Sequence, residues 1–470
     1  MPTLKKVSFW LVCLTLAISL ILQASGQVTR TLPAVTSSVV VVVGATLIDG
    51  TGAPPIPDTT LVIKEGRILQ IGRRGEVPIP AGAQIIEAEG KYLIPGLIDA
   101  HVHYNAPFLH RLYLAHGVTS VRDVGTSLER ILTLREEIAR GNILAPRLFA
   151  TGPAINPRSV KAMGLSSARE MTLKLAEAGV DGIKVTGYNE EELKDILEVA
   201  HAHGLLVFGH TRLDPGALRA VQIGLDGIEH VTDVLEDCVE QNPPFPPDFD
   251  WSNRDHFFRY YYSQLHRAVD RKKLDQIIQL MVQNDVYLDP TLVNYHRGFV
   301  QRDTPELAAD PAFRYMPKEY DRSNRYGHYG AEDRQQWEKT FALMQEATYK
   351  FFKAGGFLLM GTDSQAAAPD GALPGWSMHQ ELEFFVGAGL TPMEALQTAT
   401  FNNAKVMNQE KDLGTLETGK YADLVILNGN PLEDIRQTKS IHLVIKDGLV
   451  LDPQKLLEEH LRHYGERGRP

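Results

Sequence analysis

Short apolar runs and amphipathic stretches alternate through the middle of the chain. Helix-like stretches such as Glu190 to His203 and Leu274 to Asn284 separate eight runs with the length and composition of buried strands. Eight strands alternating with helices predict an α/β fold, a closed parallel (β/α)₈ TIM barrel. An open doubly wound sheet shares the alternation, but no Gly-rich dinucleotide fingerprint follows the first run. The eight runs are Leu97–His103, Val118–Asp123, Arg147–Gly152, Gly182–Thr186, Leu205–His210, Gly227–His230, Val286–Pro290 and Leu358–Asp363.

Both ends of the chain contain short β-branched runs instead, punctuated by Gly and Pro. We expect residues 38–94 and 405–455 to meet as one composite β-sandwich domain beside a barrel of residues 95–404. Residues 456–470 are expected to be a C-terminal tail. The β-branched runs are residues 39–43, 61–64 and 68–71, then 422–427, 442–446 and 449–451.

Two intervals are long for connections between a barrel strand and its helix. Residues 235–270 contain four prolines and a Tyr-rich stretch, and residues 296–335 are rich in Arg, Asp and Tyr. Both follow strand ends, so both would overhang the mouth of the barrel. We expect them to be lids over a substrate.

The N-terminus has the order of a secretory signal. Lys5 and Lys6 precede an apolar run over residues 7–22, and small residues follow up to Gly26. We expect residues 1–26 to be a signal peptide cleaved after Gly26, residues 27–37 to be a linker, and the mature protein to be exported to the periplasm or secreted. The alternative is an N-terminal membrane anchor, for which this run is short of the roughly 20 residues that a span needs.

The composition indicates which kinds of binding partner to expect. The 470 residues carry a formal net charge of −10, which argues against sequence-independent nucleic-acid binding. A small-molecule substrate is the expected partner, and a homo-oligomer is left open. Of the two cysteines, Cys13 lies in the expected signal, so Cys238 is expected to be a buried structural thiol.

The strand ends hold the candidate chemistry. His101 and His103 stand two residues apart on the first run, so both imidazoles and Asp99 share one face. The carboxyl ends of barrel strands meet at one mouth, so metal-capable groups from five strands converge there. Imidazole and carboxylate are the donors that zinc and similar divalent ions accept. The predicted metal ligands are His101, His103, Lys184, His210, His230 and Asp363.

Lys184 needs a special explanation, because a charged lysine inside an apolar strand is costly unless paired or modified. Two neighbouring metal ions need an anionic bridge, and a neutral lysine amine that takes up carbon dioxide becomes a carbamate that supplies one. We therefore expect two divalent ions, Zn²⁺ in the first place, and a carbamylated Lys184. The alternatives are an ion pair with Asp363 or a site for one metal.

The segment 93–103, Leu-Ile-Pro-Gly-Leu-Ile-Asp-Ala-His-Val-His, resembles the signature of the amidohydrolase superfamily. Residues 361–364, 390–396 and 414–425 resemble further motifs of that superfamily, and the resemblance runs from about Val39 to Leu451. It is strongest with the imidazolonepropionase-like branch, which includes metal-dependent Xaa-Pro dipeptidases. The resemblance implies the same six ligands, with Asp363 as the catalytic acid and base.

Two loops depart from that pattern. Residues 153–158 lack the histidine that many dipeptidase-like members carry after the third strand, and the loop after the fourth strand is short. Such loops contact substrate in the family, so the substrate stays open. Candidate substrate contacts are Tyr188, His296 and Arg297, and Arg122 as the alternative to an ion pair. His201 and His203 diverge on a helix and are set aside.

These patterns predict a hydrolase that cleaves a C–N bond in an amide, dipeptide or cyclic amide. Metal-activated hydroxide attacks the carbonyl, and Asp363 moves the proton to the leaving nitrogen. The alternatives are a deaminase, or an esterase or lactonase, on the same barrel. A catalytically inactive binding protein is disfavoured, because Asp363 and Lys184 are both present.

Overall fold

The computed structural model describes residues 39–211, 215–240, 245–246, 248–250, 252–317, 328–365 and 371–465. The expected signal peptide and linker lie outside these residues, so cleavage and export stay predictions. Among the described residues, no helix combines the length and the apolar character needed to cross a membrane.

Two parallel four-stranded sheets form the middle of the chain, in the orders β13-β6-β7-β8 and β12-β11-β10-β9. Seven of the eight expected runs contain one of these strands, which gives the α/β content expected of a TIM-barrel type fold. The strands are β6 (Leu97–His103), β7 (Val118–Asp123), β8 (Arg147–Ala150), β9 (Ile183–Val185), β10 (Val207–Gly209), β11 (Gly227–Glu229), β12 (Tyr287–Asp289) and β13 (Ser364–Gln365).

The eighth run differs from the expected strand. Residues 358–363 make only an isolated parallel bridge, between Leu358 and Leu288, and β13 begins after them. The backbone still bonds to both sheets, from Leu359 N to Leu288 O at 2.9 Å and from Ala100 N to Met360 O at 3.0 Å. Asp363 has a φ of 54°. A positive φ interrupts an extended strand, and this is why the ladder is short here.

Hydrogen bonds also join the other edges of the two sheets. Ile155 N donates to Lys184 O at 2.8 Å, and Thr186 N donates to Ile155 O at 2.9 Å. The strand ends of both sheets are thereby held around one centre, where the candidate ligands lie.

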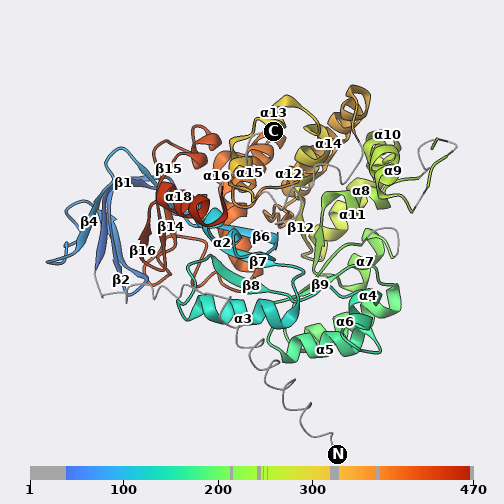
Figure 1. Ribbon diagram of the computed structural model, residues 1–470, viewed down its shortest axis with the longest axis horizontal. Helices are drawn as coiled ribbons and strands as arrows, with labels where there is room; N and C mark the ends of the chain where they lie inside the picture. The colour runs from blue at the N-terminus through green and yellow to red at the C-terminus, as the bar shows by residue number, and fades with distance from the viewer. Residues whose placement is uncertain are drawn as a thin grey trace, which may run out of the picture. The chain divides into compact units, whose positions relative to one another are not determined.

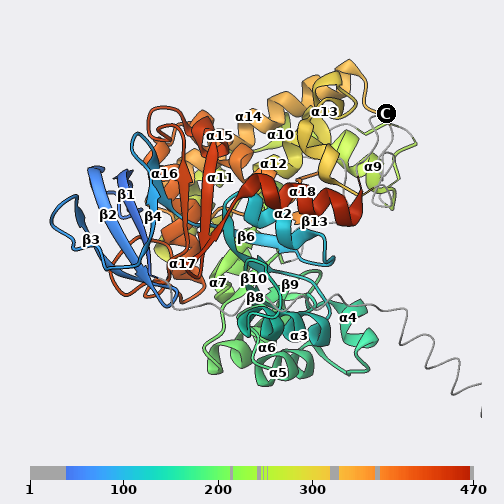
Figure 2. The same ribbon diagram turned by 60° about the vertical axis from the view of Figure 1, so that its left-hand side comes forward.

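Helices follow the strands and cover the sheets, and α3, α5 and α6 lie on one side of them (Figures 1 and 2). Helix α6 shows why they form: Asn189 and Glu192 make a reciprocal capping box, and its buried residues recur at helical spacing. The helices before β12 are α2 (Leu109–Ala115), α3 (Leu128–Ala139), α4 (Pro157–Ala162), α5 (Ala168–Glu177), α6 (Glu190–Ala202), α7 (Ala217–Ile223), α8 (Val231–Asp237), α9 (Arg254–His256), η1 (Phe257–Tyr261), η2 (Tyr262–Gln264), α10 (Leu265–Ala268) and α11 (Arg271–Gln283).

The helices after β12 include the longest one, α14, which packs against α11 and α15. Buried Cys238, at the end of α8, donates its thiol to Val234 O at 3.1 Å, in agreement with the expected structural role. These later helices are α12 (Leu292–Tyr295), η3 (His296–Val300), α13 (Pro305–Ala308), η4 (Pro311–Tyr315), α14 (Ala331–Lys353), α15 (Trp376–Ala388), α16 (Pro392–Gln397), η6 (Thr398–Asn402), α17 (Asn403–Val406), η7 (Ile435–Lys439) and α18 (Pro453–Tyr464).

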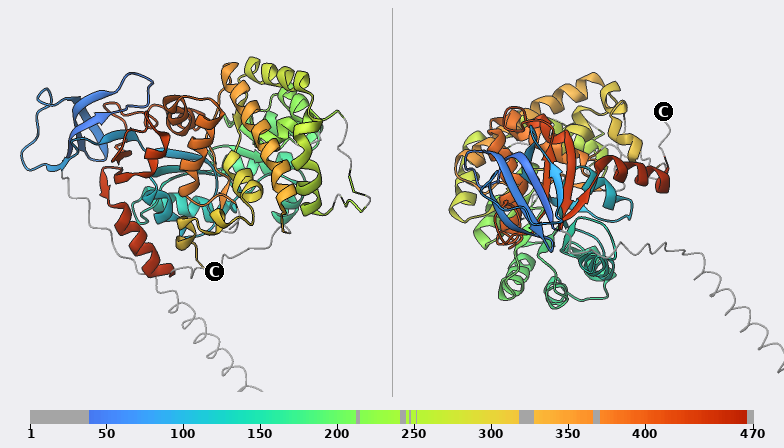
Figure 3. Two further views of the ribbon diagram at one scale, coloured as in Figure 1. Left: turned by 90° about the horizontal axis from the view of Figure 1, so that it is seen from above. Right: turned by 90° about the vertical axis from the view of Figure 1, so that its left-hand side faces the viewer.

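An eight-stranded sheet contains strands from both ends of the chain, in the order β16-β15-β14-β5-β1-β2-β3 with β4 beside β1. Figure 3 shows the blue and the red strands side by side. β5 joins the ends, because it pairs with β1 on one edge and with β14 on the other. The expected division into a β-sandwich domain and a barrel stays a prediction. The strands are β1 (Val40–Leu47), β2 (Ile56–Lys64), β3 (Arg67–Arg73), β4 (Gln84–Glu87), β5 (Tyr92–Pro95), β14 (Leu424–Leu427), β15 (Ile441–Lys446) and β16 (Leu449–Leu451).

The expected C-terminal tail is mostly a packed helix. Helix α18 contacts α2 and η4. Leu456 is buried, and His460 Nε2 bonds to Tyr315 O at 2.6 Å. The apolar residues of α18 fall on one face, and this face finds a partner in α2.

The two long connections contact each other through aromatic rings. Phe258 of η1 stacks on Phe299 of η3 with ring centroids 4.7 Å apart, and Phe299 stacks on Trp337 at 4.4 Å. Parts of both connections lie outside the described residues. Their role as lids stays a prediction.

Candidate metal centre

The six predicted ligands come together at one end of the parallel strands. His103 Nε2 lies 3.1 Å and His101 Nε2 lies 3.6 Å from Asp363 Oδ1. The rings of His101 and His230 are 5.0 Å apart, and His210 stacks on His230 at 4.5 Å. Donor atoms of His101, His230 and Asp363 all lie within 4.8 Å of one another.

Two of these residues reach the centre through an unusual backbone conformation. His230 follows β11 with a φ of 68°, and Asp363 precedes β13 with a φ of 54°. The turn redirects side chains that a straight strand would place on its other face. Gly361 makes room for this, because a Cβ atom there would lie 2.3 Å from Asp289 Oδ2 and 2.5 Å from His101 Cβ.

Asp363 is held by neighbours on both of its oxygens. Oδ1 faces the two histidines of β6, and Oδ2 accepts a hydrogen bond from Asn294 Nδ2 at 2.8 Å. Burial alone would raise the pKa of Asp363, but the hydrogen bond from His103 and the charges of His101 and His103 hold it far below its usual range. Asp363 is therefore ionised at neutral pH.

Beneath His101 lies a buried layer of charge. His101 Nδ1 contacts Glu229 Oε2 and lies 3.2 Å from Asp289 Oδ2. Burial and Lys184 oppose protonation of the imidazole, but Glu229 and Asp289 outweigh them and raise the pKa of His101 to about 9. Both carboxylates thus lie on Nδ1, which leaves Nε2 facing Asp363.

Arg122 completes this layer from β7. Its guanidinium bonds to Glu229 Oε1 at 2.9 Å, to Tyr287 OH at 3.1 Å and to Ala100 O at 2.7 Å, and lies 3.9 Å from the ring centroid of Phe208. Of the two alternatives for Arg122, the structure contains the ion pair. A role in substrate binding stays a prediction.

Lys184 points into the same layer from β9. Its Nζ lies 3.7 Å from Glu229 Oε2 and has no hydrogen-bond partner among the described residues, although the side chain is only 3% exposed. A buried amine that has one ion pair and no hydrogen bond is only partly compensated for its burial. Lys184 Nζ therefore has the surroundings of an amine whose missing bonds come from a covalent modification or a bound ion.

His210 and His230 each have a partner on their other ring nitrogen. His210 Nδ1 lies 3.2 Å from Asp233 Oδ2, and His230 Nδ1 lies 2.6 Å from Thr291 Oγ1. Burial and the neighbouring His210 lower the pKa of His230 well below its usual value, so its imidazole is neutral. A neutral imidazole whose Nδ1 is bonded presents Nε2 to a metal.

Asp99 and Asp123 support the backbone of the site. Asp99 accepts from the hydroxyl of Thr362 at 2.6 Å and from Thr362 N at 3.0 Å, and burial raises its pKa to about 7. Asp123 accepts from Tyr104 N at 2.6 Å. Both carboxylates tie the residues next to the ligands in place.

The candidate substrate contacts fall in different surroundings. Tyr188 is buried and lines a cavity of about 300 Å³ between the loops after β8 and β9, where Asn156 and Pro157 also lie. His296 packs against Phe341 and Phe384. Their roles in binding stay predictions.

Two other groups lie away from the six ligands. Arg297 is fully buried, and its Nη1 bonds to Asp310 at 2.5 Å and to Gln380 at 3.0 Å, so it anchors η3. His201 and His203, at the end of α6, bond to Asp226 and to Val199 O.

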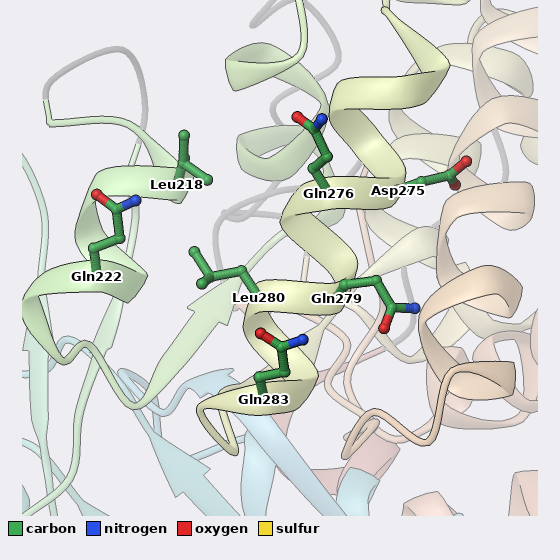
Figure 4. A pocket seen from close by; sticks show the side chains of 7 residues that line it. All are labelled: Leu218, Gln222, Asp275, Gln276, Gln279, Leu280 and Gln283. Atoms are coloured by element: carbon green, nitrogen blue, oxygen red, sulfur yellow. The ribbon is translucent and has the colours of Figure 1, made fainter.

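A second hollow lies outside the two parallel sheets. Figure 4 shows it between α7 and α11, where Gln222, Gln276, Gln279 and Gln283 line it with Leu218 and Leu280. It contains none of the candidate ligands. It therefore has no part in the chemistry of the centre.

The sequence did not single out Glu229, Asp289, Thr291 or Asn294. Two of them could have been found from the sequence. Glu229 is an acid next to the candidate ligand His230, and Asp289 is an acid in the apolar strand Tyr287–Asp289. Thr291 and Asn294 left no signal, because only the fold brings them to the centre.

A family model that describes the amidohydrolase family matches residues 92–451. The chain belongs to this family, which confirms the resemblance expected from the sequence. The family comprises hydrolases that act on carbon–nitrogen bonds, the class of enzyme expected above.

Individual relatives are distant. A crystal structure of a putative prolidase from Bifidobacterium longum is similar at 26% identity and a TM-score of 0.65, over 90% of this chain and 99% of that one. Ochratoxinase from Aspergillus niger is 22% identical, over 88% of this chain and 86% of its own length. The match to adenine deaminase from Paracoccus denitrificans (strain Pd 1222) is 34% identical, but it spans 14% of this chain and only 12% of that protein.

Proposed function

We propose that the protein is a metal-dependent hydrolase that cleaves the C–N bond of an amide, a dipeptide or a cyclic amide. The observation that carries the proposal is the convergence of His101, His230 and Asp363, whose donor atoms lie within 4.8 Å of one another. Membership of the amidohydrolase family and similarity to a prolidase and an ochratoxinase support this bond type.

The residues fit a divalent metal on chemical grounds. Imidazole nitrogens and a carboxylate are the donors that zinc accepts, and His101, His210 and His230 each already have a partner on Nδ1. We propose that His101, His103, Lys184, His210, His230 and Asp363 would hold two divalent ions, most readily Zn²⁺. The Nζ of Lys184 is buried and has no hydrogen-bond partner among the described residues, which supports a carbamate there.

The chain's own residues supply proton transfer and orientation. When bound, divalent ions supply Lewis acidity, which lowers the pKa of water and polarises a carbonyl. Asp363 is ionised, so it accepts the proton of the attacking water and delivers it to the leaving nitrogen. Asn294 fixes the carboxylate of Asp363 during this transfer.

We also propose the finer architecture: the two parallel sheets form one closed (β/α)₈ barrel, and the eight-stranded sheet belongs to a small domain beside it. Hydrogen bonds across both edges of the parallel sheets support closure. The N-terminal pattern supports export after cleavage near Gly26, and the intact mass of protein from its natural host tests this.

Asp363→Asn tests the mechanism. We expect turnover to fall by about 10²–10⁴-fold or more, since the general base is lost. Metal content should fall less, because five other ligands remain. Turnover is measured on Xaa-Pro dipeptides and N-acyl amino acids, with ammonia release as the assay for deamination, and metal content by elemental analysis.

The matched variant His101→Ala removes a ligand outright, so it should lower metal content together with turnover. Wild-type turnover in Asp363→Asn at full metal content would rule out Asp363 as the base. Wild-type protein that is active without bound metal would overturn the proposed function itself.

A further inference from the structure

One short turn bonds to two of the candidate site residues at once. Thr291, which follows β12 with a φ of 49°, places its Oγ1 2.6 Å from His230 Nδ1. Three residues later, Asn294 Nδ2 donates to Asp363 Oδ2 at 2.8 Å. Residues 291–294 therefore set the orientation of a histidine from β11 and of the aspartate that precedes β13.

A buried carboxylate on another helix holds this turn. Glu381 of α15 is fully buried. Its Oε1 accepts from Leu292 N at 2.8 Å and its Oε2 accepts from Val293 N at 2.6 Å. These are the first N–H groups of α12, which have no partner within the helix. Because both oxygens are used, the carboxylate fixes the position and the tilt of the backbone between Thr291 and Asn294.

Burying this carboxylate is expensive. Burial raises the pKa of Glu381 well above its usual range, and the two backbone donors only partly offset that cost. An apolar side chain at this position would avoid this penalty but would leave the N–H groups of Leu292 and Val293 without their acceptor. The two hydrogen bonds do not offset the whole free energy of burying the Glu381 carboxylate. A need to hold the turn 291–294 rigidly would explain why the carboxylate is there.

We propose that Glu381 is a positioning residue of the metal centre, which acts through the turn 291–294 to fix His230 and Asp363. With Nδ1 of His230 bonded to Thr291, Nε2 is the nitrogen left for a metal. Asn294 holds the carboxylate of Asp363 from the side away from His103. The inference rests on the proposed function and adds a residue that touches neither metal nor substrate.

The decisive variant is Glu381→Gln, which keeps the side-chain shape but replaces one acceptor oxygen with an amide that opposes a backbone N–H. We expect the zinc-loaded protein to lose its metal to a chelator faster, by at most about 10–100-fold, which is the change in metal affinity when a direct partner of a ligand is lost. We also expect kcat to fall while KM changes little, because the variant misaligns Asp363 and alters none of the candidate substrate contacts.

A matched control separates positioning from a loss of stability. Asp423 is also a buried carboxylate that accepts a backbone N–H, from Asp447 at 2.7 Å, but it lies beside the eight-stranded sheet. Asp423→Asn should lower Tm without changing metal loss. If Glu381→Gln lowers Tm and retains zinc as the Asp423→Asn variant does, the proposal is overturned.

Thr291→Val keeps the proposal testable if Glu381→Gln does not fold. It removes the partner of His230 but keeps the two backbone hydrogen bonds to Glu381. It should speed metal loss by a similar factor. In the double variant, the two effects should be less than additive, because both act through the same turn. Strict additivity would show that Glu381 acts by another route.

The outcomes also separate the two proposals. Wild-type protein that retains no divalent metal overturns the proposed function and this inference together. Wild-type protein that retains metal, with both variants unchanged in metal loss, overturns the positioning role alone.

Discussion

At the scale of single residues, the centre depends on which atom of each side chain is already bonded. His101 uses Nδ1 toward Glu229 and Asp289, and His230 uses Nδ1 toward Thr291. Each ring is thereby left with Nε2 for the centre. The sequence predicts which residues are candidate ligands, but the orientation of their side chains comes from acids and a hydroxyl elsewhere in the chain.

Glu229→Met tests whether metal binding depends on the acids that orient His101. The change removes one of the two acceptors of His101 Nδ1 and leaves the buried charge of Arg122 without its carboxylate. We expect metal affinity to fall by about 10–100-fold. The free energy of unfolding should fall by about 3–5 kcal/mol, as expected when one partner of a buried pair is removed. Metal titration and urea unfolding measure the two effects.

The double variant Arg122→Met with Glu229→Met provides the control. It also removes the stranded charge, so much of the stability should return while metal affinity stays low. If the metal affinity recovered as fully as the free energy of unfolding, an orienting role for Glu229 would be contradicted.

At the scale of elements, the parts that carry the site are short, and neighbouring elements hold them. Strands β9 to β12 have three residues each, and the segment before β13 contributes one bridge. Their positions are set by hydrogen bonds between the sheets and by packing of the helices. Helix α18 is one such support, because it covers α2, which follows β6 along the chain.

Leu456→Ala tests this support. Leu456 of α18 is buried in a cluster with Leu114, Ala115, Val444 and Leu451. We expect the change to lower the free energy of unfolding by about 2–5 kcal/mol, because it leaves a cavity. Leu449 is exposed, so Leu449→Ala should change it by less than about 0.5 kcal/mol. Equal effects of the two substitutions in urea unfolding would show that α18 does not pack as described.

At the scale of the whole molecule, buried histidines make the fold sensitive to acid. Burial, with a smaller effect of Arg111, lowers the pKa of His110 to about 4, and burial also lowers the pKa of His379. The unfolded chain binds protons on these groups near pH 6.5, whereas the folded chain does not. The contribution of these two histidines to stability is therefore complete above about pH 6.5 and is lost as the pH falls toward 4.

His110→Gln should reduce this loss. Glutamine keeps a polar atom near Tyr104 OH, which lies 2.7 Å from His110 Nδ1, and it does not titrate. Between pH 7 and pH 4, the variant should lose about 3 kcal/mol less of its free energy of unfolding than the wild type. Urea unfolding of both proteins at several pH values makes the comparison, and parallel curves for the two would contradict it.

The sequence by itself determined the class of the protein, and it predicted six candidate ligands at the ends of the strands. Alternation of strands and helices predicted the parallel sheets, and the spacing of His101 and His103 placed both on one face. Local patterns suffice for this, because periodicity and strand ends are properties of neighbouring residues. The same reasoning could not show that the eighth run is largely irregular, or that residues beyond 456 form a packed helix.

Only the tertiary structure decided what surrounds the ligands. Glu229 and His230 are neighbours that a strand would place on opposite faces, and both reach the centre because His230 turns with a φ of 68°. Glu381, Thr291 and Asn294 come from elements distant along the chain from the residues they hold. No pattern of neighbouring residues encodes such contacts, because packing of the whole chain creates them.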